Sequence, residues 1–126
     1  MKPDTPPNDL DLLPERLRSQ SRSMSEIVLP YAAALDAIAH LRASGFGLLG
    51  WEGWVSHSNG QVGHASFQGT MDIVQREGES WDEYVNRSAD FCVKTITQDQ
   101  ESWNRSPDDP AAILCFCISV DTNRCR

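Results

Sequence analysis

Residues 112–120 read Ala-Ile-Leu-Cys-Phe-Cys-Ile-Ser-Val, a run that is apolar at both odd and even positions. Successive side chains of a strand point to opposite faces, so this pattern predicts a strand buried on both sides. Cys115 and Cys117, two residues apart, are expected on the same face. Pro107 and Pro110 separate the run from the preceding element. We therefore expect residues 112–120 to form the central strand of a sheet.

The element before this strand is predicted to be a long amphipathic helix. Ser80 is followed three residues later by Glu83, a capping box in which each side chain satisfies an amide at the helix start. Apolar or small residues then recur on one face for about six turns: Trp81, Tyr84, Val85, Ser88, Cys92, Ile96 and Trp103. The helix should return the chain to the sheet.

A hairpin is predicted before the helix. Residues 48–55 are rich in aromatic and branched side chains, and Asn59-Gly60 is a strong signal for a tight turn. Alternation places Glu52 and Trp54 on one face of the strand and Trp51 on the other, unless a bulge at Gly53 resets the phase. One tryptophan would pack under the helices and the other would cover the open face. A further strand is expected from Thr70 to Gln75.

A shorter helix is expected after Pro30, with an apolar stripe from Tyr31 to Leu41 and a stop at Gly45. The predicted order is helix, strand, strand, strand, helix, strand. It indicates an α+β two-layer sandwich, in which an approximately four-stranded, largely antiparallel sheet carries two helices on one face. The opposite face is then covered by its own side chains and by the N-terminal segment, and it becomes a candidate binding surface.

Residues 1–25 contain four prolines and a serine-rich stretch, and they are predicted to form a flexible arm. The alternative is that Leu10, Leu12, Leu13 and Leu17 form a short helical turn that docks on the body or on a partner. Residues 26–126 are expected to form a single α+β domain.

Negative charge is concentrated in one segment. Eight acidic residues between Asp72 and Glu101 face only three basic ones, which leaves −5 of the total charge of −7. Such a surface repels nucleic acid and anionic membranes and attracts a basic partner. No apolar run approaches the roughly 20 residues of a membrane span, and no signal peptide is evident, so a cytoplasmic location is expected. The four cysteines are expected to be reduced, with those of the predicted strand and helix buried.

The chain lacks a clear motif for catalysis or cofactor binding. His57 and His64 flank the predicted turn and could approach each other, yet a metal site needs three or four ligands with outer-shell support. We therefore assign no catalytic residue, metal ligand or cofactor. A surface for a protein partner is predicted instead, built from acidic side chains and one aromatic anchor: Glu52, Trp54, Asp72, Glu79, Asp82, Glu83 and Asp90.

The stretch Leu48-Leu49-Gly50-Trp51-Glu52-Gly53-Trp54, followed by Asn59-Gly60, Gly63-His64, Gly69-Thr70 and residues 115–121, resembles small bacterial toxin immunity proteins. These proteins accompany secreted or contact-delivered toxins, and the resemblance covers about residues 30–121. It implies a stoichiometric, acidic inhibitor that blocks the active site of a basic toxin such as a nuclease. The expected function is thus non-catalytic toxin binding. The alternatives are a small hydrolase-like or metal-dependent enzyme that uses the hairpin histidines, and a regulatory protein-interaction module.

Overall fold

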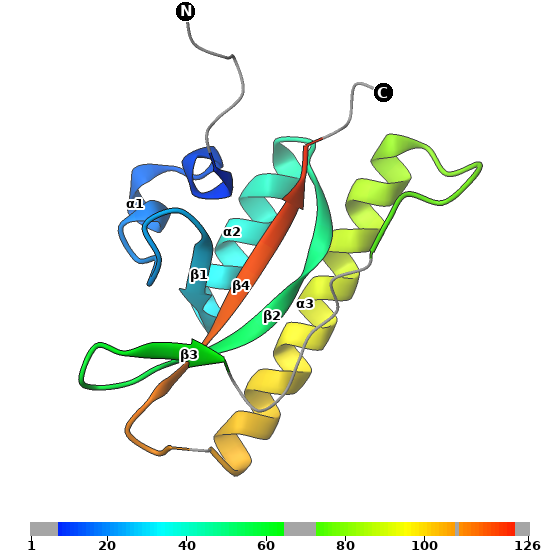
Figure 1. Cartoon of the computed structure of the whole chain (residues 1–126). Helices are drawn as coiled ribbons and strands as arrows, with labels where there is room; N and C mark the ends of the chain where they lie inside the picture. Colours follow the sequence, from blue (N-terminus) through cyan, green and yellow to red (C-terminus); the bar gives the residue numbers. More distant parts are fainter. Residues whose placement is uncertain (1–7, 65–72, 108, 123–126) are drawn as a thin grey trace, which may run out of the picture.

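The structure is a computed structural model that describes residues 8–64, 73–107 and 109–122. Two short helical turns come first and are followed by alternating strands and longer helices (Figure 1). In chain order the elements are η1 (Asp9–Leu12), α1 (Glu15–Arg18), β1 (Ile27–Pro30), α2 (Tyr31–Ala43), β2 (Gly47–Ser56), β3 (Val62–His64), α3 (Trp81–Arg105) and β4 (Ile113–Asp121).

The described strands form one antiparallel sheet in the order β1-β4-β2-β3. As residues 112–120 predicted, β4 is central and pairs with β1 on one side and β2 on the other. Helices α2 and α3 pack together against one face of this sheet (Figure 1). The predicted two-layer α+β sandwich is therefore confirmed.

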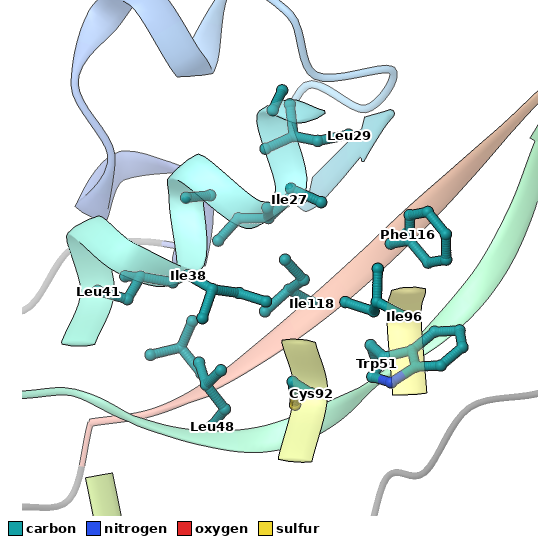
Figure 2. Packing of buried hydrophobic residues seen from close by; sticks show 14 of the residues in the cluster. Ile27, Leu29, Ile38, Leu41, Leu48, Trp51, Cys92, Ile96, Phe116 and Ile118 are labelled. Carbon is teal, nitrogen blue, oxygen red and sulfur yellow. The ribbon is translucent and has the colours of Figure 1, made fainter. Parts of the chain in front are cut away.

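The main core lies between the sheet and these two helices (Figure 2). Trp51 of β2 and Phe116 of β4 meet edge to face there, with ring centroids 5.3 Å apart. The Trp51 Nε1–H donates to Oγ1 of Thr95 on α3 at 2.8 Å, so the polar atom of the buried indole is satisfied. Burying a large apolar side chain contributes roughly 1.5–3 kcal/mol, and this layer holds most of the buried side chains among the described residues.

The phase of β2 is set by a bulge that lies nearer the strand start than expected. The register shifts between Leu48 and Gly50, whereas Gly53 pairs regularly with Phe116. Gly50 has φ = +142°, a conformation that favours glycine. Because no shift occurs beyond Gly50, the predicted alternation from residue 51 to 55 is correct.

Both predicted signals at helix ends are confirmed. After α2, Gly45 has φ = +86°, and the amide of Phe46 donates to the carbonyl of Leu41 at 3.0 Å, as in a Schellman motif. At the start of α3, the Ser80 hydroxyl accepts from the Glu83 amide, and the Glu83 carboxylate accepts from the Ser80 amide. These ends fix where α2 and α3 meet the sheet.

The strand predicted from Thr70 to Gln75 is wrong for its described residues, and the strand β1 was not predicted. Residues 73–75 of the expected strand Thr70–Gln75 are not in a strand, while residues 70–72 lie outside the described ranges. The Ile73 amide donates to the Leu49 carbonyl on β2. The fourth strand is instead β1, whose last residue is Pro30. Proline is tolerated at a strand end on the sheet edge.

The prediction of a flexible arm is wrong for residues 8–25. Leu10, Leu13 and Leu17 belong to the main core, and Leu17 is fully buried. The guanidinium of Arg16 on α1 forms an ion pair with Asp36 on α2. The N-terminal segment is thus a packed part of the fold, as the alternative with a docked helical turn predicted.

Candidate functional site

The face of the sheet opposite α2 and α3 carries a second, smaller apolar cluster. We call it the open face; it is the side of the sheet turned toward the viewer in Figure 1. Val28, Cys115 and Cys117 are buried in this cluster, and the half-buried ring of Trp54 packs on them. The register explains the grouping, because Trp54 lies opposite Cys115 and Glu52 lies opposite Cys117. Both residues predicted for the partner surface on β2 therefore point to the open face.

Residues 21–26 form a loop beside β1 at the edge of this face. The hydroxyl of Ser21 donates to the Glu26 carbonyl at 2.7 Å and accepts from the Val28 amide at 3.2 Å. The Arg22 amide donates to the Val28 carbonyl at 2.8 Å. The loop thus occupies both outward backbone groups of Val28, which would otherwise offer an edge for pairing. It also presents Met24, which is 97% exposed.

A cleft of about 260 Å³ opens between this N-terminal segment and β4. It lies between an acidic residue from each end of the segment and residues 117–119 of the strand. Its lining residues are Asn8, Asp9, Ser25, Glu26, Cys117, Ile118 and Ser119. The Oδ2 atom of Asp9 accepts from the Val120 amide at 3.0 Å, which holds η1 against the end of β4.

The electrostatic environment of the cleft is negative. Burial raises the pKa of Asp9, and the hydrogen bond from Val120 offsets part of that rise. Burial, and after it the carboxylates of Glu26, Glu52 and Asp9, raise the pKa of the Cys117 thiol to about 12. Three acidic side chains therefore surround Cys117. The cation of Arg22 lies at the other end of the cluster, beside Cys115.

The other predicted partner residues that the structure describes do not join this site, because they lie on α3 or in the loop before it. Two of them hold the fold together. Glu79 forms an ion pair with Arg87 at 2.7 Å and accepts from the Arg76 amide, interactions that lower its pKa to about 2. Asp90 forms an ion pair with Arg42 at 2.6 Å and so joins α3 to α2.

Glu83 is likewise occupied, since its carboxylate completes the capping box of α3. Asp82 is exposed in the first turn of that helix. Asp72 lies outside the described residues. The predicted surface is therefore divided between the two sides of the sheet, with Glu52 and Trp54 on the open face and the described α3 residues on the helical side.

The sequence reasoning did not identify Asp9 and Glu26 as site residues. Both lie in or next to the segment that was interpreted as an arm, so no element was available to place them. The only signal was the set of leucines at helical spacing, which implied that residues near Asp9 could dock on the body. Their proximity to Glu52 depends on contacts between distant parts of the chain.

Of the two hairpin histidines, His57 has a side-chain partner in the structure. Nδ1 of His57 lies 3.1 Å from Oδ2 of Asp109, which connects the turn to the segment before β4. The Ala111 amide and then His57 lower the pKa of Asp109. Within the described ranges, no three His, Cys, Asp or Glu side chains are grouped so that they could hold a metal ion.

The described cysteines are expected to react slowly with thiol reagents. Cys92, Cys115 and Cys117 are each no more than 4% exposed, and burial raises the pKa of all three thiols. We expect native protein to be labelled rapidly at Cys125 alone, the residue that the sequence places in a polar tail, and at all four sites after unfolding. Mass spectrometry of a timed alkylation would measure this. Rapid native labelling of Cys115 or Cys117 would contradict the burial of the cluster.

Comparison with protein-family models, with curated proteins and with solved structures finds no match for this chain. None of the helices in the described ranges combines the length and apolar character needed to cross a membrane.

Proposed function

We propose that this chain is a non-catalytic immunity protein that binds a basic toxin domain through its open face. The observation that carries the proposal is the position of Trp54 and Glu52 beside a cleft that also holds Asp9 and Glu26. Trp54 is a partly exposed aromatic side chain, a residue type that often dominates protein interfaces, and three acidic side chains lie nearby around Cys117. The negative charge selects a basic partner and accelerates its approach.

Inhibition follows from the chemistry of such a partner. A nuclease holds its anionic substrate with lysine and arginine side chains, because phosphate contacts supply most of its affinity for nucleic acid. Carboxylates on the open face would pair with those side chains and occupy the surface that phosphates need. This mechanism requires only a stable complex and no reactive group. It is consistent with cysteines that are buried and with a histidine that pairs with Asp109.

The test measures whether the purified protein inhibits the activity of its purified toxin partner. Under this proposal a neighbouring gene encodes the toxin domain; that gene product would be purified, and its activity would be titrated with increasing amounts of the protein. We expect full inhibition at a 1:1 ratio. Trp54→Ala should raise the dissociation constant at least about tenfold, the effect of losing an interface hot spot.

Phe91→Ala is the matched control, because Phe91 is a partly exposed aromatic residue on α3, away from the open face. Its loss should leave inhibition unchanged. Absence of a complex with the neighbouring gene product, or an equal effect of both variants, would contradict the proposal. Circular dichroism of each variant would verify that the fold is intact.

A further inference from the structure

We propose that the cleft between the N-terminal segment and β4 receives one arginine side chain of the basic partner. The proposal rests on the function proposed above and specifies the group that the open face recognises. The first argument is size. At about 260 Å³ the cleft is smaller than the roughly 300–1,000 Å³ of a typical small-molecule pocket, and it suits a single long side chain.

The second argument is the hydrogen-bonding character of the lining. Asp9 and Glu26 contribute carboxylates, which only accept hydrogen bonds when ionised. Asn8 also lines the cleft, and its Oδ1 atom is buried and accepts from no donor among the described residues. A ligand that brings several N–H donors therefore meets carboxylate acceptors when it fills the cleft.

The third argument distinguishes arginine from lysine. A guanidinium carries five N–H donors in a rigid plane, so one group can serve several acceptors in different directions. An ammonium group is more strongly hydrated and loses more when it leaves water. Asp9 is itself partly desolvated, and a weakly hydrated cation would compensate its charge at the smallest cost.

The walls also suit the aliphatic part of the side chain. Cys117 lines the cleft on the open face with a buried, uncharged side chain. Met24 stands fully exposed on the loop that supplies Ser25 and Glu26, and a flexible thioether adapts readily to a partner's surface. The loop is held in place by Ser23, whose hydroxyl accepts from the amides of Ser25 and Glu26. Such preorganisation reduces the entropy lost on binding.

The experiment uses ethylguanidinium chloride as a probe for the arginine head group and needs no partner. Backbone amide shifts of the full chain would be followed by NMR during titration, with sodium chloride and ethylammonium chloride at equal ionic strength as comparisons. We expect saturable shifts at residues 25–26 and 117–120 with ethylguanidinium, and weaker binding of ethylammonium. Sodium chloride should give no saturable shift at these positions.

Glu26→Gln removes one ionised acceptor without changing side-chain size, and it should weaken the probe about tenfold, as expected for one charge-assisted hydrogen bond. Glu101→Gln is the control, since Glu101 is exposed on α3. Shifts that do not saturate, or that are equal in Glu26→Gln and the original chain, would overturn the inference. If the probe fails while Trp54→Ala still weakens inhibition, the cleft proposal is wrong and the proposed function stands. If the probe binds but no toxin complex forms, the cleft does recognise a guanidinium group and the proposed immunity function is wrong.

Discussion

A chain that begins at Met24 should fail to form the cooperative fold seen here. The truncation removes Leu10, Leu13 and Leu17, which lie in the main core with exposures of 6%, 2% and 0%. Each buried leucine contributes roughly 1.5–3 kcal/mol. Domains of this size are stable by only about 5–15 kcal/mol, so losing all three removes much or all of the net stability. Thermal unfolding by circular dichroism would measure the loss.

Single substitutions in the N-terminal segment test its contribution to the free energy of unfolding. Leu17→Ala should lower the free energy of unfolding by about 2–5 kcal/mol, the range for a leucine truncated in a packed core. Leu12→Ala is the matched control, because Leu12 is only partly buried at the edge of the core. Its effect should be clearly smaller. Equal midpoints for Leu17→Ala and the original chain would mean that the N-terminal segment is not part of the folded unit.

The N-terminal segment shows where sequence reasoning reached its limit. Leu10, Leu13 and Leu17 have helical spacing, yet η1 and α1 span four residues each, too few for a periodic pattern to emerge above a proline- and serine-rich background. The strand β1 is also short, and its Pro30 was interpreted only as a helix start. Such elements exist because of tertiary packing, and local sequence carries little of that information.

Longer patterns were more informative. The apolar run of β4, which faces both sides of the sheet, predicted the central strand, and alternation along β2 correctly placed Trp51 and Trp54 on opposite faces.

The role of the charged residues was harder to predict from the sequence. Acidic residues near the start of α3 suggested a binding surface, but Glu79 and Glu83 are engaged in an ion pair and a cap. Composition counts charges without showing which ones are already paired within the fold.

The position of the acidic side chains on the two sides of the sheet leads to the last prediction, which concerns association rate. The double reversal Glu26→Lys with Glu52→Lys, on the open face, should slow association with the basic toxin domain by about tenfold or more, because electrostatic steering changes on-rates by 10- to 1,000-fold. Asp82→Lys with Glu101→Lys, on α3, is the matched control. Each double variant changes the net charge by +4, from −7 to −3, so a difference between them reflects position and not total charge.

Glu79, Glu83 and Asp90 are left out because their reversal would break an ion pair or a cap and confuse binding with stability. Association would be measured by stopped-flow fluorescence at several salt concentrations, after melting curves have verified each fold. At physiological ionic strength the screening length is only about 8 Å, so charges on the helical side should act weakly on a partner at the open face. If the α3 pair slows association as much as the open-face pair, the partner does not bind at the open face. If salt and both pairs leave the rate unchanged, steering plays no part, and the electrostatic argument for a basic toxin partner fails.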